Sequence, residues 1–226
     1  MNNKGFSLLE LLIAISVSSV LVIAVSDFAA SSLIGSNQDY NKTLVLTNAK
    51  EAVSIVQRQV RMARSVESNN SQPDANAPGA PGNLYSWSGA AGSGSSLILA
   101  VPARNSSGDL IYIDGLHATI YTDNVIFFLD SSTKKLFRRF IKNENAPGNV
   151  GVTTCPAIAA TPTCPVDATV VDDVADLATA YLDSGNAAVS LPSGTEAVNY
   201  TVTETRTING KSYSGTYTSL GSLRNK

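Results

Sequence analysis

Hydrophobic and polar positions divide the chain into three regions with different periodicities. The first is an almost unbroken apolar run over residues 6–30, which carries only two charges, Glu10 and Asp27. As an α-helix this run would be about 37 Å long, enough to cross the hydrocarbon core of a bilayer. The pattern therefore predicts a hydrophobic transmembrane helix over 6–30.

The second region, residues 31–66, has the pattern of an amphipathic helix. Apolar residues recur at steps of three and four, at Val45, Ala49, Ala52, Val56, Val60 and Ala63. No proline lies between Phe6 and Gln72, so one helix can run through both regions, with Gly35 as its weakest point. We expect the apolar stripe of this second half to pack on a globular domain.

The third region, residues 67–226, has the composition of a β-rich globular head. It begins with a loop over Asn69–Gly94 that is rich in Ser, Asn, Gly, Ala and Pro, and we expect Trp87 to hold the end of this loop. Short β-rich runs predict strands at Ser96–Val101, Leu110–Ile113, Ala118–Tyr121, Asn124–Leu129, Leu136–Ile141, Tyr200–Ile208 and Lys211–Leu220. One helix followed by antiparallel strands predicts an α+β fold.

Two turns in this head predict hairpins. Asn209-Gly210 between two alternating runs is the strongest short-range hairpin signal, and Asp130–Lys135 separates another pair of runs. The segment Val170–Leu182 fits either a short helix or a strand.

Composition and charge narrow the range of functions. The 226 residues are sufficient for one large domain or two small ones, and only 15% are charged. The net charge of −2 disfavours nucleic acid as the main partner, because phosphate binding normally requires a basic excess. With one histidine, His117, and two cysteines, the sequence predicts no catalytic residues, no metal site and no cofactor.

The apolar run has three competing interpretations. It can be a secretory signal cleaved near Ala24-Val25-Ser26, or a plain membrane anchor. Neither explains Glu10, because a carboxylate within hydrocarbon costs about 2–3 kcal/mol and is therefore functional by default. The third interpretation accounts for this acid.

Gly5-Phe6-Ser7-Leu8-Leu9-Glu10 followed by a long apolar helix resembles the N-terminus of type IV pilins and type II secretion pseudopilins. The resemblance implies that residues 1–5 are a leader that prepilin peptidase removes between Gly5 and Phe6. It also implies N-methylation of Phe6 and a role for Glu10 in setting assembly register, by pairing with the N-terminal amine of a neighbouring subunit or its own. The implied fold is pilin-like, with a long N-terminal helix packed on an antiparallel β-sheet domain.

Several segments of the head are similar to large PilW-like (J-type) minor pilins: Val56–Arg64, Asn124–Leu129, Leu136–Arg139, Val174–Asp183 and Ser222–Asn225. This resemblance implies a minor type IV pilin that primes or caps a pilus, with other major and minor pilins and the inner-membrane assembly platform as partners. Lys4 favours a single-pass inner-membrane subunit with a periplasmic head before assembly, and the pilus at the cell surface after it. The alternatives are a minor pseudopilin of a type II secretion system, or a secreted binding or enzymatic domain with a discarded signal.

Three smaller signals lie in the head and at the end of the helix before it. Cys155 and Cys164 predict a disulfide if the head is exported to an oxidising compartment, with a stabilisation of about 2–3 kcal/mol. Arg58, Arg61 and Arg64 on one helix face, with Arg138-Arg139, permit a basic track for DNA, but we interpret them as cations near the helix end and on solvated strand ends. We interpret Asp172, Asp173 and Asp176 as a solvated face and not as a metal site.

Overall fold

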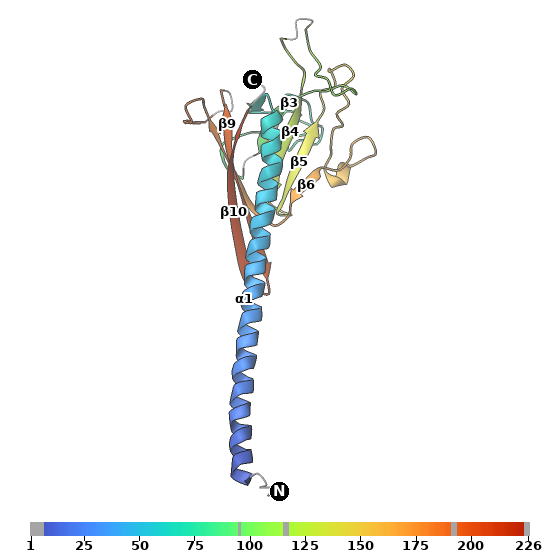
Figure 1. Ribbon diagram of the computed structural model, residues 1–226. Helices are drawn as coiled ribbons and strands as arrows, with labels where there is room; N and C mark the ends of the chain where they lie inside the picture. Colours follow the sequence, from blue (N-terminus) through green and yellow to red (C-terminus); the bar gives the residue numbers. More distant parts are fainter. Residues whose placement is uncertain (1–6, 95, 115–117, 191–193, 224–226) are drawn as a thin grey trace. The chain divides into compact units, whose positions relative to one another are not determined.

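The computed structural model describes residues 7–94, 96–114, 118–190 and 194–223. Its internal contacts divide the chain into two units, Met1–Leu44 and Val45–Lys226. The boundary falls within helix α1, Leu8–Met62, so each unit contains part of this helix (Figure 1). The structure is an α+β arrangement of a long N-terminal helix and antiparallel β-sheets, as the sequence predicts, and it is consistent with the pilin fold.

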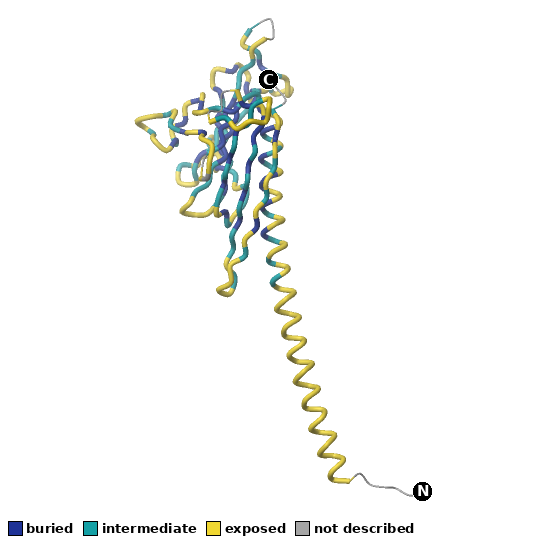
Figure 2. The backbone as a smooth tube through the Cα atoms, turned by 90° about the vertical axis from the view of Figure 1, so that its left-hand side faces the viewer, coloured by how far each residue is buried: buried dark blue, intermediate teal, exposed yellow. Residues whose placement is uncertain are grey.

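The N-terminal unit is helical from Leu8 onward, which confirms the helix expected over the apolar run. Every residue from Leu8 to Asn37 is exposed (Figure 2). The helix continues through Gly35, and a Cβ atom built there would meet nothing within 4 Å. This unit therefore carries a large apolar surface with no partner among the residues that the structure describes.

In the second unit the predicted apolar stripe is the buried face of the helix. Val45, Ala49, Ala52, Val56, Val60 and Ala63 are all fully buried. The alanine and valine side chains at these positions are short, so the helix backbone can approach the sheets closely.

The helix ends earlier than the sequence predicts. We expected it to continue to Val66, but α1 ends at Met62, and Ser65–Glu67 forms strand β1. The Arg64 N–H donates to the Ala100 carbonyl at 2.8 Å instead of continuing the helical ladder. Pairing with the sheet buries Val66, so tertiary burial outweighs the helical periodicity here.

The first sheet is antiparallel, with strand order β1-β3-β4-β5-β6. Besides β1 it contains β3 (Leu97–Pro102), β4 (Thr122–Asp130), β5 (Lys135–Ile141) and β6 (Ala168–Val171). These bounds confirm three of the predicted strands and the hairpin over Asp130–Lys135.

The second sheet has strand order β10-β9-β7-β2, and the short strand β8 also pairs with β7. Its members are β2 (Gly92–Ser93), β7 (Val174–Leu182), β8 (Ala188–Val189), β9 (Ala197–Ile208) and β10 (Lys211–Ser222). The predicted β9–β10 hairpin is confirmed, and Asn209 and Gly210 turn it with positive φ angles of 51° and 76°. On the exposed face of this hairpin, threonine and serine hydroxyls pair across the strands, for example Thr201 with Thr218 at 2.9 Å.

Two predicted strands of the head are absent from the described structure, and the segment that fitted either a helix or a strand is extended. Leu110–Ile113 and Ala118–Tyr121 are not strands; they form only isolated bridges, from Leu110 to Arg104 and from Tyr112 to Ile120. The Asn105 side chain and Gly108 hold the segment before Leu110 in a turn, which prevents a longer ladder there. The ambiguous segment Val170–Leu182 is extended: it lies in β6 and β7, and Asp173 with a φ of 59° separates the two strands.

The main core of the head joins the helix to both sheets. It contains Val53, Val56 and Val60 from α1, Leu99, Val125 and Phe127 from the first sheet, and Leu177, Val198 and Tyr200 from the second. The second sheet approaches the helix closely at two glycines of β10. A Cβ atom at Gly215 would lie 3.0 Å from Val45 Cγ1, and one at Gly221 would lie 2.9 Å from Val60 Cγ1.

Candidate functional site

The first turn of α1 contains the acid that the sequence singles out. A carboxylate oxygen of Glu10 accepts a hydrogen bond from the Ser7 backbone N–H at 3.0 Å, and the Leu11 N–H donates to the Ser7 carbonyl at 3.1 Å. Ser7-Leu8-Leu9-Glu10 thus has the spacing of a capping box, and Glu10 satisfies one of the free donors at the helix start. Sequence reasoning missed this local role, although the Ser-x-x-Glu pattern signals it.

The predicted cleavage and methylation residues, Gly5 and Phe6, lie outside the residues that the structure describes. The described chain begins one residue later, at Ser7, and the helix begins at Leu8.

The apolar segment of α1 tolerates several serines because their hydroxyl groups bond within the helix. Ser16 donates to the Ile13 carbonyl at 2.9 Å, and Ser26 donates to the Val22 carbonyl at 2.8 Å. Such internal bonds remove most of the cost of a hydroxyl in hydrocarbon. The helix is long and apolar enough to cross a membrane, and none of its most apolar window is buried.

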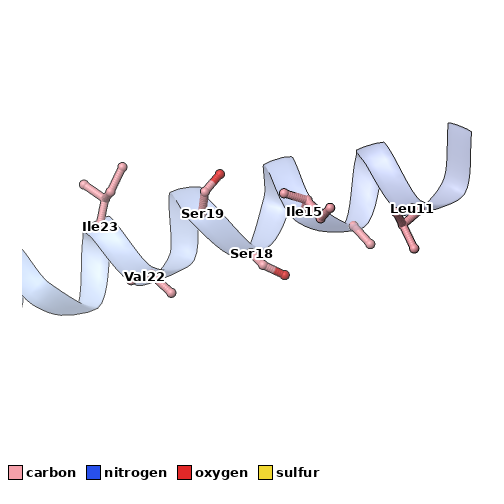
Figure 3. Close-up of a pocket in the computed structure, with 7 residues that line it drawn as sticks. Leu11, Ile15, Ser18, Ser19, Val22 and Ile23 are labelled. Carbon is pink, nitrogen blue, oxygen red and sulfur yellow. The ribbon is translucent and has the colours of Figure 1, made fainter. Parts of the chain in front are cut away.

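The surface of this helix has a shallow hollow over more than three turns, which Figure 3 shows with its side chains. The hollow is lined by Leu11, Ala14, Ile15, Ser18, Ser19, Val22 and Ile23. The small side chains between the larger apolar ones permit close approach of another helix, as in membrane helix pairs.

The comparisons with known proteins concern this same N-terminal segment. Residues 1–26 match the family model described as the prokaryotic N-terminal methylation motif. The match indicates a type IV pilin-like substrate of prepilin peptidase, which can be a pilin or a pseudopilin, and it implies assembly with other pilins. Proteins with this motif are structural rather than catalytic, and the apolar helix implies association with the membrane. No curated protein matches the chain.

Within the head, the structure overturns our interpretation of Arg139 as a solvated strand-end cation. Its side chain is 2% exposed, and its guanidinium contacts Asp167 at 2.6 Å and Asp74 at 3.0 Å. The Trp87 indole N–H donates to the same Asp74 carboxylate at 2.7 Å, which confirms that Trp87 holds the end of its loop. The guanidinium also lies over the rings of Trp87 and Phe128.

The electrostatics of this cluster keep Arg139 charged. Burial alone would lower the pKa of Arg139, but the hydrogen bond and charge of Asp167, with the charge of Asp74, raise it above its ordinary value. The cluster joins β5 to the loop over Asn69–Gly94 and to the segment around the cysteines. It is therefore a structural centre of the head.

Cys155 and Cys164 form the predicted disulfide. The Asp167 N–H donates to the Cys155 carbonyl at 2.8 Å, so the closed loop is attached directly to the Arg139 cluster. Within the loop, Ile158 is 99% exposed.

The remaining candidates do not converge on one site. Asp172 pairs with Lys135 at 3.0 Å and Asp173 pairs with Arg206 at 3.7 Å, both at the turn between β6 and β7. Arg58 and Arg61 are exposed on α1 and Arg64 follows the helix end, while His117 lies outside the described residues.

Glu204 is a buried acid that sequence reasoning missed. It is 1% exposed on β9, and one carboxylate oxygen accepts a hydrogen bond from the Asn48 side chain of α1 at 3.2 Å. Burial raises the pKa of Glu204, and the hydrogen bond from Asn48 offsets only part of this effect.

Proposed function

We propose that this chain is a minor type IV pilin that primes or caps a pilus. Prepilin peptidase cleaves it between Gly5 and Phe6 and methylates Phe6, and the remaining chain enters the filament. The observation that carries the proposal is the exposed apolar helix that begins at Leu8 within the matched motif, with Glu10 in its first turn.

The exposed apolar surface of the helix is buried by different partners before and after assembly. Before assembly, lipid covers the segment over residues 6–30, with the head in the periplasm and Lys4 on the cytoplasmic side. After assembly, the helices of neighbouring pilins replace the lipid. The new amine at Phe6 and the Glu10 carboxylate then pair, because an unpaired charge among packed apolar helices would be costly.

The size of the head supports a minor rather than a major subunit. The Val45–Lys226 unit contains two sheets and a disulfide-closed loop. A major subunit repeats the same lateral contacts along the whole filament, whereas a subunit at the tip is free of this restriction and accommodates a bulkier head.

Mass spectrometry on the native cell tests the proposal. We expect a mature chain that starts at N-methylated Phe6, and its presence in sheared pili at far fewer copies than the major subunit. A chain that starts at Asp27 would show a secreted domain instead. A normally processed chain that is absent from pili, in cells where its deletion abolishes protein secretion, would show a pseudopilin.

A further inference from the structure

The two adjacent arginines of β5 have opposite surroundings. Arg139 is buried and neutralised by two aspartates, whereas Arg138 points to the other face of the strand and lines a cleft of about 290 Å³. Among the residues that the structure describes, none accepts a hydrogen bond from the Arg138 side chain. The cleft lies entirely within the Val45–Lys226 unit, beside the last turn of α1.

The walls of the cleft combine positive charge with an apolar floor. Val101, Val125 and Phe140 from three neighbouring strands supply the apolar surface. Arg104 lines the cleft together with Arg138; it uses one donor on the Gly108 carbonyl at 2.6 Å, and the other donors of its guanidinium have no acceptor among the residues that the structure describes. Among the described residues that line the cleft none is acidic, although acids outnumber bases in the whole chain.

This combination selects an anion that carries an apolar group close to its charge. A guanidinium with a free planar fork binds a carboxylate through two parallel hydrogen bonds. Burial of the neighbouring apolar floor adds to the binding free energy only if the same ligand also covers this floor.

The small volume of the cleft distinguishes between carboxylate sources. It is at the lower limit of pockets that hold drug-sized ligands, and it fits about one large side chain. In the last residue of a peptide, the carboxylate and the side chain are attached to the same Cα atom, so a single residue can satisfy both walls. An internal Asp or Glu uses its side chain for the charge and needs a second residue, and a longer groove, for the apolar floor.

We propose that this cleft binds the C-terminal residue of a partner protein, with its α-carboxylate on Arg138 and Arg104 and an apolar side chain on Val101, Val125 and Phe140. Gln59 of α1 also lines the cleft, and its side-chain amide, which bonds to no described residue, is available for the peptide backbone. The proposal does not depend on the filament to which the chain belongs.

Titration of the full-length chain in zwitterionic micelles with two peptides tests this proposal. The probes are acetyl-Gly-Gly-Phe with a free carboxylate and the same peptide as its C-terminal amide. Binding is followed by the NMR signals of the arginine side chains and of the valine methyl groups. We expect saturable shifts at Arg138 and Val101 with the acid, and at least fivefold weaker binding of the amide.

Variants complete the test. We expect Arg138→Gln to weaken binding of the acid at least fivefold, and the matched variant Arg61→Gln, at an exposed position of α1 that does not line the cleft, to leave it unchanged. Equal binding of acid and amide, or equal loss in both variants, would overturn the proposal. Octanoate that shifts the same resonances while the peptide acid does not would also overturn it, in favour of a fatty-acid site. Circular dichroism of both variants checks that the fold is retained.

Discussion

The Arg139 guanidinium lies 2.6 Å from a carboxylate oxygen of Asp167, with both side chains almost completely buried. Because Asp74 completes the cluster from the loop over Asn69–Gly94, one cation connects three segments of the head. Removal of this cation leaves two buried carboxylates with no counter-charge, which is far more costly than loss of a surface ion pair.

Arg139→Ala is therefore expected to destabilise the head by about 3–5 kcal/mol. The adjacent Arg138→Ala, which breaks no ion pair, is the matched control, and we expect it to cost less than about 1 kcal/mol. Denaturant unfolding of the full-length chain in micelles, followed by the fluorescence of Trp87, measures both. Similar losses for the two variants would contradict the role of the buried cluster.

The disulfide is expected to stabilise the head by a smaller amount. Replacement of Cys155 and Cys164 by serine opens a loop of about ten residues and should cost roughly 2–3 kcal/mol in the chain-entropy model. Thermal unfolding with and without a reducing agent checks this expectation: the wild-type chain should lose stability on reduction, and the double serine variant should not respond. A response in the serine variant would show that the reducing agent acts elsewhere.

Local patterns predict much of this fold because each signal depends on a few neighbouring residues. Absence of proline and a three-four periodicity are sufficient for the long helix, and Asn209-Gly210 is sufficient for the last hairpin. The disulfide is predicted from two cysteines in a head that we expect to be exported to an oxidising compartment. These features form wherever the rest of the chain permits them.

The features that were missed depend on distant residues. Asp167 and Asp74 are 28 and 65 positions from Arg139, and no local pattern shows that they neutralise it. The early end of α1 has the same cause, since Arg64 leaves the helix for a carbonyl of β3. Tertiary partners decide both outcomes, so periodicity alone gives the wrong boundary and the wrong exposure.

The buried carboxyl of Glu204 should make the head less stable as the pH rises. Its pKa is higher in the folded chain than in the unfolded chain, so the folded state binds more protons between the two values. The stabilisation is fully present below the unfolded pKa and is lost as the pH rises through the folded pKa. Glu204→Gln keeps an acceptor for Asn48 without the charge, and we expect it to raise the unfolding free energy at pH 7.

Unfolding free energies of wild type and Glu204→Gln between pH 4 and pH 8 give the comparison. The variant should show a weaker fall with rising pH, while Glu144→Gln, which alters an exposed acid, should follow the wild type. A difference between wild type and Glu204→Gln that does not change with pH would exclude titration of this group as the cause.

Close packing of β10 on the helix predicts a strong effect of a single methyl group. In Gly215→Ala the new Cβ would lie 3.0 Å from Val45 Cγ1 and 3.1 Å from the Leu46 backbone nitrogen, so the backbone must move. We expect a loss of about 1–3 kcal/mol in unfolding free energy. Gly82→Ala, where the new Cβ would lie at an ordinary 3.5 Å from the Gly79 carbonyl oxygen, is the control and should change stability little. A neutral Gly215→Ala would mean that helix and strand separate at little cost.

The first turn of α1 permits a test that separates the two roles of Glu10. Its carboxylate caps the Ser7 N–H within the same chain, and in the assembled filament we propose that its charge pairs with the amine of Phe6. Glu10→Gln retains an oxygen that can accept the Ser7 hydrogen bond but removes the charge, whereas Glu10→Ala removes both. If charge pairing sets the register, both variants should be processed normally, keep the fold of the head and fail to enter pili.

Quantitative mass spectrometry of sheared pili and of the membrane fraction measures this outcome for each variant. Asp27→Asn, which removes the other acid of the apolar run, is the matched control and should enter pili at wild-type levels. Incorporation of Glu10→Gln but not Glu10→Ala would instead assign the role of Glu10 to the helix cap. Normal incorporation of Glu10→Ala would exclude both roles and would contradict the proposed assembly mechanism.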